Sequence, residues 1–122
     1  MNDRYLILVV VAVIGVFVYL RLRGSISAKQ AREFLQAGAV VIDVRTEGEY
    51  ASGALPGARN LPLDQLGDRI RQEVPDRESV VLCHCLSGMR SAQATGLLRK
   101  MGYRHAFNLG GYRRAGAILA KN

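Results

Sequence analysis

The chain has 122 residues, of which 49% are hydrophobic and 22% are charged, and its formal net charge at neutral pH is +7. These values are typical of one globular domain and exclude an intrinsically disordered chain. Two cysteines are too few for a small fold built around several disulfides. The apolar residues are unevenly distributed, because the sixteen residues from Tyr5 to Leu20 include no charged residue.

This uncharged segment predicts a membrane anchor within residues 1–24. As a helix it would extend about 24 Å, against a hydrocarbon core of about 30 Å. The segment is therefore short, but Tyr5 and Tyr19 lie near its ends, where aromatic residues favour the membrane interface, and Arg4 and Arg21 can extend outward. A buried helix is disfavoured, because the segment has no polar face.

The charges beside the segment predict its orientation. Four Lys and Arg residues follow it within a dozen positions and one precedes it, so the positive-inside rule places the following domain on the cytoplasmic face of the inner or plasma membrane. The alternative is a cleavable signal peptide, with cleavage near Ser25-Ile26-Ser27 and a periplasmic domain. Arg21 and Arg23 argue against this alternative, since a signal peptide is normally neutral and small at that point.

The residues after the anchor alternate between helical and extended patterns. Ser27 and Gln30 form a capping-box pattern before a helix that ends at Gly38, and Ala39 to Val44 predicts a buried strand. Further helices are predicted at 47–52, 63–74, 91–101 and 112–119, and extended segments at 60–63, 79–84 and 105–109. The pattern predicts an α/β domain over residues 25–122, with a small parallel β-sheet flanked by helices on both faces and preceded by one transmembrane helix.

The loop from Cys85 to Ser91 lies between a predicted strand and a predicted helix. Ligands bind at the carboxyl ends of parallel strands, where a helix N-terminus offers unpaired backbone N–H groups and partial positive charge. The helix dipole and the nearby Arg90 both favour the thiolate form of a cysteine at this point. Gly88 gives the loop the freedom to direct several N–H groups at one position. Cys85 is therefore the candidate nucleophile, held in an anion-binding loop.

The other cysteine and the two histidines are expected to be structural. Cys83 lies within a predicted strand and is expected to be a small buried residue. A disulfide between Cys83 and Cys85 is disfavoured by the strained geometry it requires. Together with His84 and His105 these cysteines lack the paired spacing of a zinc site, so neither a metal nor a cofactor is predicted. A regular strand directs His84 away from Cys85, so His84 is not the expected base.

Three stretches of the chain resemble one family. One is the loop Cys85-x-x-Gly88-x-Arg90-Ser91, and another is Met101 to Gly111. The third, Val41 to Leu63, has the family's signature residues Asp43, Arg45, Glu49, Gly53, Pro56, Gly57 and Ala58. These stretches cover most of the chain after Ser27, and they resemble the rhodanese-like sulfurtransferases, in particular the single-domain members.

The resemblance implies an enzyme that carries sulfur as a persulfide on Cys85. The sulfur would come from a small anionic donor such as thiosulfate and pass to a thiol, cyanide or protein acceptor. Asp43 and Arg45 would connect the first loop to Glu49 and support the site. The chain departs from the family at Ala54-Leu55, where His-Ile is usual, and at Ala115, where tryptophan is common. The loop that binds substrate and persulfide would comprise Leu86, Ser87, Gly88, Met89, Arg90 and Ser91.

Three other functions remain to be weighed. Phosphatases of related fold use a similar loop with five residues between cysteine and arginine, whereas four separate Cys85 from Arg90, which suits a single sulfur atom better than a phosphoryl group. A membrane-tethered sulfur-relay or regulatory module with little turnover of its own stays open, since it would keep the same loop. Nucleic acid is not an expected partner, because no aromatic interleaving or binding motif accompanies the basic residues Arg99, Lys100, Arg104, Arg113 and Arg114.

Overall fold

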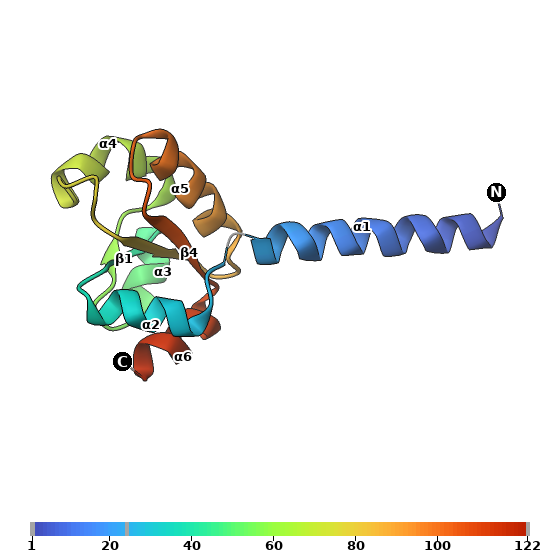
Figure 1. The fold of residues 1–122 in the computed structure, drawn as a ribbon, viewed down its shortest axis with the longest axis horizontal. Coiled ribbons are helices and arrows are strands. Elements are labelled where there is room, and N and C mark those ends of the chain that lie inside the picture. The colour runs from blue at the N-terminus through green and yellow to red at the C-terminus, as the bar shows by residue number, and fades with distance from the viewer. Residues whose placement is uncertain (1, 24, 122) are drawn as a thin grey trace.

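Four parallel strands form the centre of the domain. The computed structural model describes the backbone of residues 2–23 and 25–121, and the side chains of this part except those of residues 20–23 (Figure 1). The sheet has the order β2-β1-β3-β4, and all neighbouring pairs are parallel. The strands are β1 (Val40–Asp43), β2 (Arg59–Asn60), β3 (Val81–His84) and β4 (Ala106–Gly110).

Helices cover both faces of this sheet, as the alternating pattern predicted (Figure 1). On one face α4 (Leu63–Glu73) and α5 (Met89–Lys100) pack against Ile42, Val81 and Cys83 of the strands. On the other face α2 (Ala28–Gln36) and α6 (Tyr112–Ala120) pack against Val41, Leu82 and Leu109. Successive residues of β1 and β3 thus enter opposite cores. Each fully buried Leu or Ile contributes about 1.5–3 kcal/mol to folding, so the cores on both faces of the sheet stabilise the domain.

Local capping groups fix where the helices begin. The Ser27 side chain accepts a hydrogen bond from the Gln30 N–H, as the capping-box pattern predicted. Thr46 and Glu49 form a complete capping box at the start of α3 (Glu47–Ser52). The predicted helix at 91–101 begins two residues earlier, at Met89, because Gly88 caps it in the left-handed conformation with φ of 94°.

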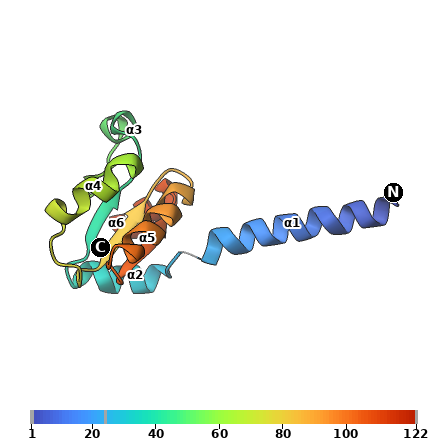
Figure 2. The same cartoon turned by 90° about the horizontal axis from the view of Figure 1, so that it is seen from above.

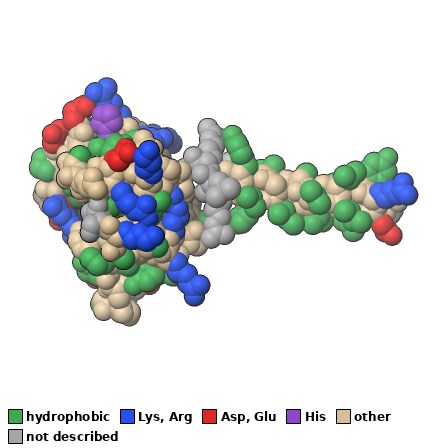
Figure 3. Space-filling model, turned by 60° about the horizontal axis from the view of Figure 1, so that its bottom comes forward, with side chains coloured by type: hydrophobic (Ala, Val, Ile, Leu, Met, Phe, Trp, Pro, Cys, Tyr) green, Lys and Arg blue, Asp and Glu red, His purple; other side chains and the backbone are tan. Residues whose placement is uncertain are grey.

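The predicted anchor segment forms a helix, α1 (Asp3–Arg23), that lies apart from the layered domain (Figures 1 and 2). Apolar side chains are exposed along it from Tyr5 to Tyr19, and they form the green surface of the helix in Figure 3. Among the residues whose side chains are described, no helix combines the length and apolar character needed to cross a membrane. The prediction of a transmembrane helix is therefore not confirmed.

Candidate active site

The candidate site lies between the end of β3 and the start of α5. Because the strands are parallel, the carboxyl ends of β1, β3 and β4 meet at one edge of the sheet, and Asp43 and His84 are paired there in register. Cys85 directly follows β3, and its backbone N–H donates to the Gly110 carbonyl at 3.2 Å. The loop is therefore attached to β4 at the residue that carries the thiol.

The Cys85 sulfur is buried and surrounded by hydrogen-bond donors. The Gly88 N–H donates to Sγ at 3.0 Å, and the Ser91 N–H donates at 3.4 Å. The Ser91 hydroxyl oxygen lies 3.4 Å from the same sulfur. Cys85 has no exposed surface, so protein groups enclose the sulfur. The loop thus converges on one atom, as the sequence predicted for Cys85.

The environment of this thiol favours its ionised form. Burial opposes ionisation, but hydrogen bonds from the Ser91 side chain and from the backbone N–H groups of Ser91, Gly88 and Ser87 outweigh it, and the pKa of Cys85 is lowered. Complete burial raises the pKa of Cys83 to about 12, and its one side-chain hydrogen bond, with Thr95, lowers the pKa too little to offset this. Two cysteines two residues apart therefore differ in pKa, and the more acidic thiol is the one in the loop.

Arg90 has a partner that the sequence did not predict for it. Its guanidinium donates to both carboxylate oxygens of Glu49, at 2.7 and 3.0 Å. Hydrogen bonds from Arg90 lower the pKa of Glu49 to about 2, so the carboxylate stays charged at neutral pH. The Arg90 charge interacts with Cys85, as expected, but the hydrogen bonds that lower the Cys85 pKa come from loop N–H groups and the Ser91 hydroxyl.

Asp43 and Arg45 form a buried pair beside the loop. Two nitrogens of the Arg45 guanidinium donate to the Asp43 carboxylate, at distances of 2.8 to 3.0 Å. The same guanidinium donates to the Gly53 carbonyl and lies 4.8 Å from the centre of the Tyr112 ring. The resemblance implied that this pair connects to Glu49. Arg45 interacts with Glu49 through charge, and its hydrogen bond reaches the end of α3 at Gly53.

The two histidines lie in different surroundings. His84 is fully buried, neither of its ring nitrogens has a hydrogen-bond partner among the described residues, and burial lowers its pKa. Its Nε2 lies 3.7 Å from Asp43 Oδ2. His105 is near the surface, 3.4 Å from Glu78. Neither side chain has a recorded contact with the Cys85 sulfur, and the described residues include no cluster of side chains suited to a metal ion.

Asn108 is a site residue that the sequence analysis missed. It is fully buried on β4, its Oδ1 accepts from the Ser91 hydroxyl at 2.7 Å, and its Nδ2 donates to the Gly88 carbonyl at 3.2 Å. The Gly110 N–H donates to the same Oδ1 at 2.9 Å. A lone asparagine within an otherwise apolar strand was the available signal, because a buried amide requires partners.

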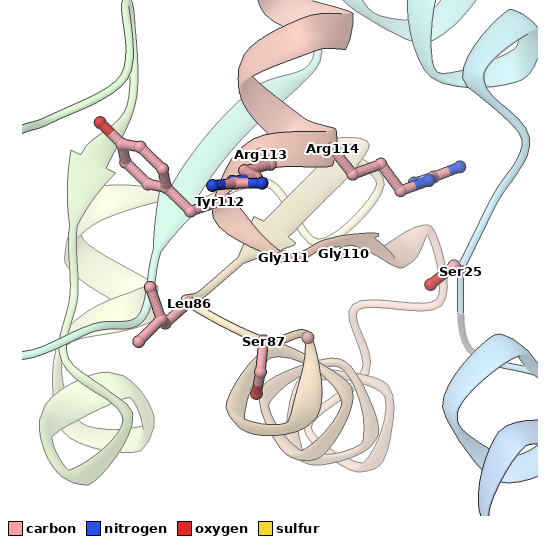
Figure 4. A pocket seen from close by; sticks show the side chains of 9 residues that line it. Ser25, Leu86, Ser87, Gly110, Gly111, Tyr112, Arg113 and Arg114 are labelled. Carbon is pink, nitrogen blue, oxygen red and sulfur yellow. The ribbon is translucent and has the colours of Figure 1, made fainter.

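A glycine turn supports the loop from the side of α6. The Tyr112 N–H donates to the Leu86 carbonyl at 3.0 Å, and a Cβ on Gly111 would lie 2.8 Å from that oxygen. Beside this contact is a pocket of about 470 Å³ between the loop and α6 (Figure 4). Figure 4 shows Tyr112 and Arg113 on one side of the pocket, Leu86 and Ser87 on the other, and Ser25 at its end.

The chain is similar to proteins of one family throughout this domain. Residues 27–115 match the model of the rhodanese-like domain. Thiosulfate sulfurtransferase PspE of Escherichia coli is 41% identical over 70 residues, which cover 57% of this chain and 67% of that protein. Human thiosulfate:glutathione sulfurtransferase is 31% identical over 100 residues, which cover 71% of this chain and 87% of that protein.

A solved structure agrees with these sequence matches. The human single-domain sulfurtransferase TSTD1 superposes with a TM-score of 0.65 at 32% identity, over 75% of this chain and 94% of that one. The parallel sheet, the helices on both faces and the cysteine loop thus define a rhodanese-like fold. The chain belongs to the rhodanese-like family and is an enzyme of the thiosulfate sulfurtransferase type.

Proposed function

We propose that this chain transfers a sulfane sulfur from thiosulfate, or from another anionic persulfide donor, to a thiol or cyanide acceptor. The observation that carries the proposal is the set of donors around Cys85 Sγ, with N–H groups at 3.0 and 3.4 Å. These donors stabilise a thiolate, which is the nucleophilic form of cysteine. The names of the relatives that act on thiosulfate, in Escherichia coli and in humans, support the choice of donor.

The reaction has two balanced halves. The Cys85 thiolate attacks the outer sulfur of thiosulfate, the sulfur–sulfur bond of thiosulfate breaks, and sulfite leaves with the bonding electron pair. The product is a persulfide on Cys85, whose terminal sulfur carries the negative charge. An acceptor thiolate or cyanide then attacks that sulfur, and Cys85 leaves as a thiolate. Loop N–H groups stabilise the anion in each state, and separate halves predict ping-pong kinetics.

Mass spectrometry of the intact protein tests this proposal. After thiosulfate treatment we expect a mass increase of one sulfur atom that a reducing thiol removes. Cys85→Ser should abolish the increase, and Cys83→Ser is the matched control that should keep it. A protein that gains no labile sulfur but hydrolyses p-nitrophenyl phosphate would be a phosphatase instead.

A sulfur-relay module is the second candidate, and the surface of the loop favours it. Leu86 and Met89 flank the buried thiol and are 59% and 52% exposed. Exposed apolar side chains around a reacting group are typical of a protein-binding surface. A relay would accept sulfur faster from a protein persulfide than from thiosulfate, whereas a thiosulfate enzyme would show the reverse order of second-order rate constants.

We also propose that α1 anchors the domain to the inner or plasma membrane, with the domain on the cytoplasmic face. Support comes from the exposed apolar side chains between Tyr5 and Tyr19, and from the basic residues that follow them in the sequence. Ser25 lines the pocket beside Leu86, so such an anchor would hold the sulfur loop near the membrane surface (Figure 4).

Membrane fractionation of the full chain tests the anchor. We expect the protein to sediment with membranes and to be released by detergent but not by salt, and Val10→Arg should shift it to the supernatant. A reporter active only in the periplasm, fused to the C-terminus, should be silent. Activity of that reporter together with a shortened N-terminus would show a cleaved signal peptide and contradict the proposal.

A further inference from the structure

The Ser91 hydroxyl lies between two groups that can both use its one hydrogen. Its oxygen is 2.7 Å from Asn108 Oδ1 and 3.4 Å from Cys85 Sγ. Ser91, Asn108 and Cys85 are all fully buried, so no solvent enters this exchange. An amide oxygen has no hydrogen to give, and therefore the contact with Asn108 requires Ser91 to donate.

The second contact depends on the charge of the sulfur. A Cys85 thiol can donate its own hydrogen to the Ser91 oxygen while Ser91 donates to Asn108. A thiolate has no hydrogen, so the same arrangement would direct a Ser91 lone pair at the negative sulfur. Rotation of the hydroxyl replaces this repulsion with a charge-assisted hydrogen bond, which is stronger than the bond between neutral groups.

The rest of the cluster can remain in place during this rotation. When the hydroxyl turns away, Asn108 Oδ1 still accepts from the Gly110 N–H at 2.9 Å. Asn108 Nδ2 still donates to the Gly88 carbonyl at 3.2 Å. No buried polar atom loses its last partner, so the exchange avoids the cost of an unsatisfied buried group. The Ser91 and Asn108 oxygens, 2.7 Å apart while the hydrogen lies between them, need only separate slightly when it turns away.

We propose that Asn108 is a positioning residue for sulfur transfer. It accepts a hydrogen bond from the Ser91 hydroxyl while the Cys85 sulfur is uncharged. When the sulfur carries the charge, the hydroxyl turns and donates its hydrogen bond to the sulfur instead. The uncharged states are the thiol and the persulfide, in which the charge lies on the terminal sulfur. The hydroxyl hydrogen would thus turn toward Cys85 Sγ when that atom is charged and back to Asn108 when it is not. The inference rests on Cys85 being the reacting thiol, as proposed above.

Other ionisable groups surround the loop, and none of them is Ser91 or Asn108. They come from every element packed there and are the Arg90–Glu49 pair, the Asp43–Arg45 pair, Cys83, His84 and Tyr112. A test must therefore compare proteins in which all of these groups are unchanged. Substitutions at Ser91 and Asn108, alone and together, meet this requirement.

The first test is a double-mutant cycle read by the pH dependence of Cys85 alkylation. Ser91→Ala should raise the Cys85 pKa by about one unit, which is about tenfold less thiolate near neutral pH. Asn108→Asp should also raise it, because a carboxylate retains the hydroxyl hydrogen and adds negative charge. In the S91A background the effect of N108D should be clearly smaller, since only its charge remains.

The matched control is Thr95→Val, which removes another buried hydroxyl from the same helix. Thr95 donates to the Ser91 carbonyl at 2.8 Å and hydrogen-bonds Cys83, and within the described part of the chain none of its hydrogen bonds reaches Cys85. We expect this variant to leave the Cys85 pKa nearly unchanged. An N108D shift of equal size with and without the Ser91 hydroxyl would overturn the inference, because Asn108 would then not act through Ser91.

The second test uses the unmodified asparagine and does not depend on N108D folding. As Cys85 ionises, the Gly110 N–H becomes the remaining donor to Asn108 Oδ1, so its proton resonance should move downfield with the Cys85 titration. The shift should be much smaller in S91A, and equal shifts would contradict the proposal. Neither test needs a sulfur donor, so a failure to form the persulfide would count against the proposed function alone.

Discussion

The Arg90 guanidinium holds both carboxylate oxygens of Glu49, with nitrogen–oxygen distances of 2.7 and 3.0 Å. The pair joins the cysteine loop to the first turn of α3, and Glu49 also accepts from the Thr46 N–H at 3.1 Å. Both side chains are about one-third exposed, at 34% and 29%. The positive charge next to the thiol is therefore balanced before any donor anion arrives.

Glu49→Gln should expose that positive charge to the donor. Glutamine keeps an acceptor oxygen for Arg90 but removes the negative charge, so we expect a severalfold lower KM for thiosulfate, with a larger effect at low ionic strength. Steady-state kinetics at two salt concentrations measure this. Glu47→Gln, at an exposed acid on the same helix, is the control. A KM that rises or stays the same in E49Q would show that Arg90 does not attract the donor.

The same pair predicts how stability depends on pH. Arg90 lowers the folded-state pKa of Glu49 to about 2, below its value in the unfolded chain, so the contribution to stability is present above about pH 4.5 and is lost as the pH falls toward about 2. Urea unfolding should show the native protein to be more stable than E49Q at neutral pH, with the difference disappearing in acid. A difference in unfolding free energy that grew on acidification would contradict this prediction.

Gly111→Ala should distort the cysteine loop. The new Cβ would lie 2.8 Å from the Leu86 carbonyl oxygen and 3.3 Å from the Ser87 carbonyl carbon, and both are backbone atoms. We expect a loss of about 1–3 kcal/mol in unfolding free energy and slower alkylation of Cys85. Gly96→Ala, which meets nothing within 4 Å in α5, is the control. It should stabilise the protein by about 0.5–1 kcal/mol.

Cys83→Ala should preserve the sulfur chemistry. Burial raises the pKa of Cys83 to about 12, so this thiol stays protonated and packs in the core. The expected cost is about 1 kcal/mol of stability, with the rate of sulfur transfer retained. Denaturant unfolding and a sulfurtransferase assay measure the two effects. Loss of transfer in a folded C83A protein would assign Cys83 a role in the reaction.

The sequence predicted the elements that depend on local patterns. Ser27 capped the expected helix, and the β-branched runs before Val44 and His84 formed the expected buried strands. The start of α5 was placed two residues too late, because residues 86–88 gave no sign that Gly88 would cap the helix. Helix periodicity locates the middle of an element better than its end.

The contacts between distant residues were harder to predict. The position of Cys85 followed from the order of strand, loop and helix, but the pairing of Arg90 with Glu49 joins residues from separate elements. Asn108 was also missed, because its role depends on β4 lying beside β3 with a register shift after Cys83. Such contacts are set by tertiary packing, so a single sequence can mark a residue such as Asn108 as unusual but does not identify its partners.

The central claim is that loop donors ionise Cys85, and the pH dependence of its alkylation tests this most directly. In the C83A protein, where Cys85 is the remaining cysteine, we predict a single titration with a pKa below the value of about 8.5 for a free thiol. Free cysteine under the same conditions is the reference. A Cys85 pKa at or above that reference would contradict the account.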